Sequence, residues 1–151
     1  MDVYAPATRL WELVSDVTNM PRWSPETFRT RWIRGSSRAK PGAWFKGTNR
    51  WGWIRWSTRC EVEVAEPGRE FTFVTYITGR RRTRWSYVFE PFDGGTTVTE
   101  SRTRLSRAFF HTLIETVFMH GHQEALENGM RATLQRIKQA AEKTATLSPR
   151  S

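Results

Sequence analysis

A carboxylate and a guanidinium share one face of a predicted β-strand near residue 100. Glu100 and Arg102 have the same parity as the apolar Val98, so all three side chains are expected to point inward. A carboxyl group in an apolar pocket has a raised pKa and is able to donate a proton. Glu100 is therefore the candidate catalytic residue, and a buried Glu100–Arg102 pair would orient a ligand carbonyl or hydroxyl. The alternative is a solvated ion pair at the end of the strand.

The histidines and the single cysteine give little indication of metal or nucleophilic chemistry. His120 and His122 stand two residues apart on a predicted helix and face different directions, and His111 is distant in sequence. No acidic or cysteine motif completes a ligand set, so no metal is predicted. No nucleophile motif and no glycine-rich phosphate loop is present, so no cofactor is predicted. Cys60 stands in an apolar, alternating context that indicates a buried thiol without a catalytic role.

Aromatic side chains are unusually numerous, with eight Trp and nine Phe among 151 residues. They either fill the core or line a cavity, and a cavity wall of aromatics with a few polar groups is typical of a small-molecule site. On the strands, residues with inward parity are expected to line this pocket. The last helix is expected to close the pocket from the other side. The predicted ligand-binding residues are Asn49, Trp56, Thr58, Phe73, Trp85, Tyr87, Glu100, Arg102, His122 and Leu126. Trp23 lies in a loop, either at the pocket entrance or, as the preferred interpretation, as a plug.

These side chains must be positioned by an antiparallel sheet and a long helix. From Thr27 to Leu105, alternating segments separated by glycine- and proline-containing turns predict about six strands. The clearest alternation runs from Ile54 to Val64, with every second residue inward. Before Thr27, the sequence predicts a short strand followed by one or two short helices. After Leu105, apolar residues recur at helical spacing, and Gly121 is expected to mark a joint in the helix.

The fold class expected from this order is α+β, a curved antiparallel sheet of six to seven strands wrapped around a C-terminal helix. A strongly curved sheet under one helix leaves room at its open end, which is the argument for a cavity. Residues 1–143 are expected to form one domain, and residues 144–151 a disordered tail.

The net charge of +9, carried by 20 Arg and 4 Lys, is compatible with nucleic acid, anionic lipid or an acidic ligand, and equally with a genome that favours Arg codons. Arg80 to Arg82 are expected at a hairpin tip and, with Arg50, Arg55 and Arg59, to form a basic exposed face. A solvated face is the preferred interpretation, followed by an anionic membrane surface and then by nucleic acid. The N-terminus has no apolar run typical of a signal peptide, so a cytoplasmic location is expected. A monomer or weak dimer is the expected oligomeric state.

Five segments together resemble a known superfamily. They are APATRLWELVSDVTNMPRWSPE (Ala5 to Glu26), PGAWFKGTNR (Pro41 to Arg50), CEVEVAEPGREFTF (Cys60 to Phe73), FEPFDGGTTVTES (Phe89 to Ser101) and ENGMRATLQRIKQAAE (Glu127 to Glu142). The sequence resembles the START-like, or SRPBCC, superfamily of polyketide cyclases, dehydrases and lipid-transport proteins, and looks closest to actinobacterial stand-alone members. The resemblance implies a helix-grip fold with a hydrophobic ligand cavity, and it implies little about chemistry.

Three functions are consistent with these observations. The first is binding of a small hydrophobic ligand, a lipid or a polyketide-like aromatic, in an internal cavity. The second is a cyclase or dehydratase that uses Glu100 as its acid or base. The third is a toxin-like or RNA- and ribosome-interacting protein that acts through the basic face. The aromatic excess and the resemblance favour the first.

Overall fold

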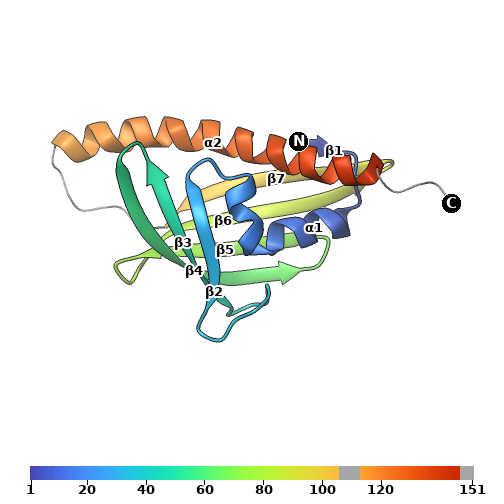
Figure 1. Cartoon of the computed structure of the whole chain (residues 1–151), viewed down its shortest axis with the longest axis horizontal. Helices are drawn as coiled ribbons and strands as arrows, with labels where there is room; N and C mark the ends of the chain where they lie inside the picture. Colours follow the sequence, from blue (N-terminus) through green and yellow to red (C-terminus); the bar gives the residue numbers. More distant parts are fainter. Residues whose placement is uncertain (106–112, 147–151) are drawn as a thin grey trace.

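A curved antiparallel sheet dominates the structure, which is a computed structural model (Figure 1). It describes residues 1–105 and 113–146, with side chains for residues 1–105 and 124–143. The sheet has seven strands in the described part, in the order β1-β7-β6-β5-β4-β3-β2. The strands are β1 (Asp2–Val3), β2 (Thr27–Ile33), β3 (Trp44–Trp51), β4 (Ile54–Glu66), β5 (Glu70–Ile77), β6 (Arg80–Phe92) and β7 (Gly95–Arg104). The expected meander is confirmed, and β1 adds a seventh strand beside β7.

The alternation that predicted β4 is interrupted by a β-bulge between Val62 and Val64. Before the bulge, Val62 pairs with Phe73, and after it Ala65 pairs with Phe71. Phe71 and Phe73 are both in the core, so Ala65 takes over the inward face and Val64 lies on the opposite face. The prediction that Val64 faces inward is therefore wrong, because one extra residue reverses the parity of the rest of the strand.

Two short helices connect the opposite edges of the sheet. Helix α1 (Ala7–Ser15) begins after Pro6, and the 3₁₀ helix η1 (Val17–Arg22) begins at Asp16, whose side chain accepts a hydrogen bond from the Thr18 N–H. Leu10, Val14 and Val17 are buried in the core. These helices fill the space between the sheet and the C-terminal helix at one end of the molecule.

The C-terminal helix α2 (Leu113–Thr146) runs over the concave face of the sheet (Figure 1). It is continuous through Gly121, so the joint expected there does not interrupt the helix. It also extends to Thr146, three residues into the predicted tail. Residues 106–112, at the start of the region where apolar residues recur at helical spacing, lie outside the described residues. No helix in the described ranges is long and apolar enough to cross a membrane.

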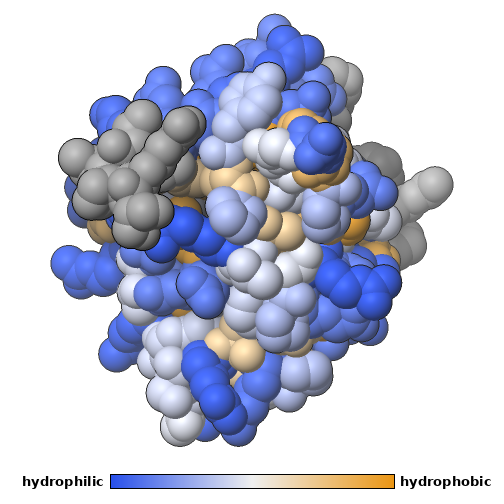
Figure 2. Space-filling view, turned by 90° about the vertical axis from the view of Figure 1, so that its right-hand side faces the viewer, coloured by the Kyte–Doolittle hydropathy of each residue, from blue (hydrophilic) through white to orange (hydrophobic). Residues whose placement is uncertain are grey.

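The second half of α2 seals one end of the molecule. Ile137 and Ala141 are fully buried in the core, and this half contacts α1, β1 and β7. Figure 2 shows the face at this end, where hydrophilic side chains predominate and apolar ones form small separate patches. The first half of α2 lies over the other end, beside the β3–β4 hairpin (Figure 1). The hydrophobic core therefore occupies one end and leaves the other for a site.

Candidate functional site

A cavity of about 180 Å³ lies between the sheet and α2. Its wall comes from the concave faces of strands β2 to β7, from the loop between η1 and β2, and from α2. Nine of the ten predicted ligand-binding residues line it: Asn49, Trp56, Thr58, Phe73, Trp85, Tyr87, Glu100, Arg102 and Leu126. The tenth, His122, has a side chain outside the described ones. The structure thus brings the predicted residues together, and their contact with a ligand stays a prediction.

The central polar feature of the cavity is a carboxyl group paired with a phenol. Glu100 on β7 stands opposite Tyr87 on β6, and the Tyr87 hydroxyl donates a hydrogen bond of 2.8 Å to Glu100 Oε1. The other oxygen, Oε2, is buried and accepts no hydrogen bond from the described residues. Burial raises the pKa of Glu100 to about 7, although the hydrogen bond from Tyr87 opposes this rise.

Tyr87 is the permanent donor of this pair. Burial first, and the nearby Glu100 charge second, raise the pKa of its phenol well above the usual value. Tyr87 therefore keeps its proton at physiological pH, while the carboxyl group changes its charge near neutrality. The free oxygen donates a hydrogen bond when Glu100 is protonated and accepts one when it is ionised.

Arg102 lines the cavity without pairing with Glu100. No ion pair joins the two side chains within the described part of the chain. The prediction that Glu100 and Arg102 form a pair, whether buried or solvated, is therefore wrong. The two residues stand two positions apart on one strand, which separates their backbones by about 6.6 Å. Arg102 lies opposite Trp85 in the β6–β7 ladder, closer to the end of the strand.

A second polar group lies on the far side of the cavity. The Thr27 hydroxyl donates a 2.7 Å hydrogen bond to Asn49 Oδ1, and Asn49 Nδ2 donates a 3.3 Å hydrogen bond to Thr58 Oγ1. Gly47 leaves room here, because a Cβ at this position would stand 3.2 Å from the Thr58 hydroxyl. Asn49 and Thr58 are both buried, so these contacts hold the amide in one orientation.

Aromatic rings form the cavity wall between the two polar groups. Phe73 packs edge-on against Phe45 at a centroid distance of 5.1 Å, and both rings are buried. Trp56 and Trp85 are only partly buried, which leaves part of each indole facing the cavity or solvent. The wall presents flat apolar surfaces that suit a planar ligand.

Helix α2 forms the cavity roof with one continuous stripe of side chains. Leu126, Met130 and Thr133 line the cavity, and Ile137 and Ala141 continue the stripe into the solid core. Gly129 allows close approach, because a Cβ there would stand 3.2 Å from Pro25 Cγ in the loop before β2. The same element therefore serves as roof at one end and core at the other.

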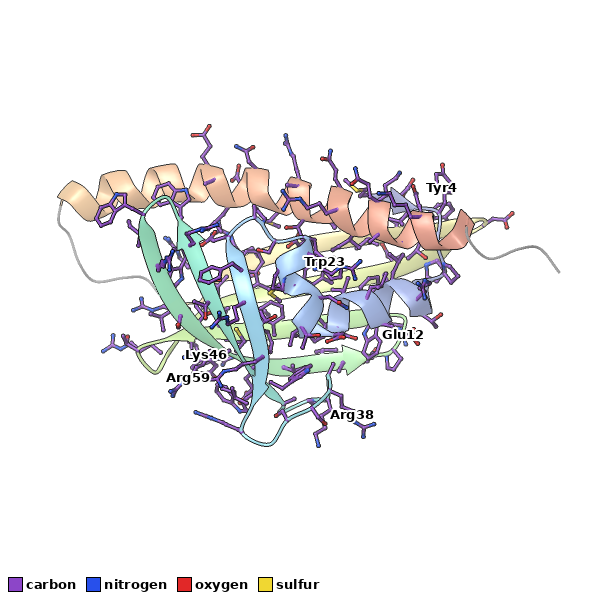
Figure 3. All side chains as sticks on the ribbon, viewed as in Figure 1. Tyr4, Glu12, Trp23, Arg38, Lys46 and Arg59 are labelled. Atoms are coloured by element: carbon purple, nitrogen blue, oxygen red, sulfur yellow. The ribbon has the colours of Figure 1, made fainter. Side chains whose placement is uncertain are left out.

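Trp23 occupies the loop beside this roof, where Figure 3 labels it. Its side chain is 3% exposed and lines the cavity, and its backbone carbonyl accepts a hydrogen bond from Arg136 of α2. The preferred interpretation of Trp23 as a plug agrees with this burial. It also contributes to the wall.

Several lining residues were missed in the sequence. Thr75 and Ile77 share the parity of Phe73, Thr83 shares that of Trp85, and Met130 follows Leu126 by one turn. Parity and helical spacing would have found these. Nothing in the sequence indicated the segment from Ser24 to Thr27, because it enters the wall as a loop.

Cys60 also lines the cavity, but its chemistry is suppressed. Burial raises the pKa of its thiol to about 12, against a smaller lowering by the Thr58 hydroxyl. The thiolate is the reactive form of cysteine, so Cys60 is not a nucleophile at neutral pH. The described residues contain no group of three His, Cys, Asp or Glu side chains that could hold a metal ion, and the side chains of all three histidines lie outside them.

The predicted basic face is partly neutralised by an acidic side chain. Arg81 and Arg84 on β6 both form ion pairs with Glu63 on β4, across the intervening strand β5, Arg84 at 2.9 Å. Arg50, Arg55 and Arg59 are exposed on β3 and β4. The cationic side chains are therefore divided between the β3–β4 and β5–β6 hairpins.

A helix-grip sheet, a roof helix and an aromatic cavity with a buried carboxyl group define a class of single-cavity ligand-binding folds. Residues 1–142 match the model of one such family, described as polyketide cyclase / dehydrase and lipid transport. The chain belongs to this family, and the resemblance seen in the sequence is confirmed. No curated protein matches the chain.

Solved structures share the fold at low identity. Protein MLL2253 from Mesorhizobium loti is 13% identical with a TM-score of 0.68, over 95% of this chain and 94% of that one. Protein Ms6760 from Mycobacterium smegmatis is 17% identical with a TM-score of 0.67, over 95% of this chain and 88% of that one. The di-domain ARO/CYC StfQ from the steffimycin biosynthetic pathway is 13% identical with a TM-score of 0.73, over 97% of this chain and 50% of that one.

Proposed function

We propose that the protein binds one compact, largely planar hydrophobic molecule that carries a hydroxyl or carbonyl group. The observation that carries this proposal is Glu100 Oε2, a buried oxygen in an aromatic cavity without a hydrogen-bond partner among the described residues. A buried polar atom left unpaired is costly, and a ligand group that pairs with it recovers this cost on binding.

The cavity dimensions favour a small aromatic ligand over a long acyl chain. A volume of about 180 Å³ is below the roughly 300 Å³ typical of sites for drug-sized molecules. Trp56, Trp85 and Tyr87 line the cavity, and aromatic side chains stack favourably with a planar ring. The family description includes both polyketide and lipid ligands, and the wall chemistry favours a polyketide-like ring system of two or three rings.

The proposal is tested with a matched pair of probes, 2-naphthol and naphthalene, titrated by fluorescence. The wild-type protein is expected to bind 2-naphthol about tenfold more tightly, since a hydrogen bond to a charged or strongly polar group has this effect on affinity. The substitution Glu100→Leu should abolish this preference while leaving naphthalene affinity similar. Absence of binding of either probe, together with native mass spectra that show only unliganded protein, would refute the proposal.

A second function is favoured by the pKa of Glu100, namely dehydration of a β-hydroxy ketone. Near pH 7 both charge states of Glu100 are populated. The carboxylate would take the proton from the carbon between the carbonyl and the hydroxyl-bearing carbon. It would then return that proton to the departing hydroxyl, so that the C–O bond breaks and water leaves. The Tyr87 hydroxyl holds the carboxyl group in place throughout.

The dehydration is tested with 3-hydroxy-1-tetralone, whose loss of water gives fluorescent 1-naphthol. Turnover above the buffer rate that disappears in Glu100→Gln supports an enzyme. Binding of the tetralone without turnover restricts the protein to ligand binding.

A further inference from the structure

A patch of two aromatic and two cationic side chains lies at the tip of the β3–β4 hairpin and on the adjoining end of β2. It consists of Phe28, Arg50, Trp53 and Arg55, and is called the hairpin-tip patch below. Trp53 is 92% exposed, and Phe28 is 38% exposed. An isolated exposed aromatic is ordinary, but an exposed Trp flanked by arginines at a hairpin tip is a combination typical of membrane-interface anchors.

The local backbone does not require Trp at position 53. Trp51 pairs with Ile54, so Gly52 and Trp53 form a two-residue loop. Gly52 has a φ of 62°, whereas Trp53 is not among the residues with positive φ, which is the arrangement of a type II′ turn. Gly52 therefore satisfies the turn, and a polar residue would serve at position 53. The indole contributes nothing to the core and projects from the tip.

The two arginines of the patch face each other despite their like charge. Arg50 and Arg55 are direct cross-strand partners, an arrangement that destabilises a sheet. Neither forms an ion pair with any described residue. Their guanidinium groups lie 5.6 and 5.7 Å from the centre of the Phe28 ring. The ring keeps both cations together and outward, where an anionic surface would relieve their repulsion.

The patch adjoins the cavity. Asn49 and Trp56 form the next rung of the ladder after Arg50 and Arg55, and both line the cavity. The tip is thus about 10 Å beyond the cavity wall, at the usual rise per strand residue. The first half of α2 lies beside the same hairpin (Figure 1).

We infer that the hairpin-tip patch docks the protein on an anionic lipid bilayer, with Trp53 in the interface and Arg50 and Arg55 on the headgroups. The net charge of +9 attracts the protein to such a surface. Docking brings the cavity to the membrane, from which an apolar ligand is collected or to which it is delivered. This transfer role rests on the proposed function, whereas docking itself does not.

Docking is measured by co-sedimentation with vesicles of mixed phosphatidylcholine and phosphatidylserine, in the absence of any cavity ligand. Binding should be weak to pure phosphatidylcholine and should fall with added salt. Trp53→Ser should lower the partition coefficient about tenfold, because the buried apolar area of the indole is lost. The double substitution Arg50→Gln and Arg55→Gln should lower the partition coefficient about 30-fold, because each cation near an anionic surface is expected to contribute roughly a five- to sixfold gain in binding.

Two matched controls keep the inference specific. Arg31→Gln with Arg59→Gln removes two exposed cations from the same sheet but from positions away from the tip, and Tyr4→Ser removes a 62% exposed aromatic from elsewhere. Both should lose much less binding than the tip variants. If tip and control variants lost vesicle binding equally, net charge alone would explain the binding, and docking through the hairpin-tip patch would be overturned. Tip-dependent binding of a single-stranded RNA without vesicle binding would also overturn it.

The outcome is separable from that of the proposed function. The tip variants should bind 2-naphthol in solution as the wild-type protein does, since none of the substituted side chains lines the cavity. Vesicle binding without naphthol binding removes the proposed function and leaves docking intact. Binding of 2-naphthol together with vesicle binding that does not depend on the tip leaves the proposed function intact and removes docking through the hairpin-tip patch.

Discussion

The hydroxyl of Tyr87 donates a hydrogen bond of 2.8 Å to one oxygen of Glu100 and leaves the other oxygen buried without a partner among the described residues. The pairing fixes which carboxyl oxygen is available to a ligand. It also couples the two pKa values, because ionised Glu100 makes ionisation of Tyr87 less favourable and the Tyr87 hydroxyl favours ionised Glu100.

Protein stability should decrease as the pH rises from 4.5 to 7. The folded-state pKa of Glu100 is about 7 and the ordinary value is 4.5, so in this range the folded protein binds more protons than the unfolded chain. The penalty should reach about 3 kcal/mol above pH 7. Urea unfolding across this range should show the decrease, and Glu100→Gln should flatten it. Glu12→Gln, at an exposed position on α1, is the control that should keep the wild-type slope.

Tyr87→Phe should raise the pKa of Glu100 above about 7. The substitution keeps the ring and removes the only described hydrogen bond that stabilises the ionised carboxyl group. A carboxyl-carbon NMR titration of the Glu100 signal measures the shift directly. Tyr76→Phe, which alters a ring packed against Trp44, should leave the titration unchanged. An unchanged midpoint in Tyr87→Phe would show that the phenol does not control the carboxyl group.

Much of this site follows from parity alone. Trp85 and Tyr87 alternate on one strand, Glu100 and Arg102 on the next, and the turn at Asp93 to Gly95 makes the strands neighbours. Inward orientation could therefore be predicted. The partner of Glu100 could not, because it depends on the register across the turn, and a shift of two residues would place Arg102 opposite Tyr87 without altering any parity.

Other features depend on tertiary structure that leaves no local pattern. The bulge near Val62 reverses the face of Val64 although the apolar alternation continues through it. Gly121 was expected to mark a joint, but the helix continues through it, because glycine costs a helix only about 1 kcal/mol, which neighbouring turns offset. The segment from Ser24 to Thr27 enters the cavity wall through loop packing, which no periodicity encodes.

The two halves of α2 should respond differently to truncation. Ile137→Ala should cost about 2–5 kcal/mol in unfolding free energy, because Ile137 is fully buried in the core. Leu126→Ala should cost less than about 1 kcal/mol, since Leu126 is only partly buried at the cavity roof. Affinity for 2-naphthol should show the opposite order, with Leu126→Ala weakened and Ile137→Ala nearly normal under folding conditions. Denaturant unfolding and ligand titration of both variants test this division.

Cys60 should report on access to the cavity. Cys60 is 3% exposed and its thiol has a pKa of about 12, so almost no thiolate is present at pH 8. A thiol reagent such as dithionitrobenzoate should modify the native protein only very slowly. It should react with one thiol per chain in urea, since the sequence contains a single cysteine. Because Cys60 lines the cavity, saturating 2-naphthol should slow any residual native reaction further. Rapid modification of the native protein that naphthol does not slow would mean that Cys60 is reached by a route other than the proposed binding cavity.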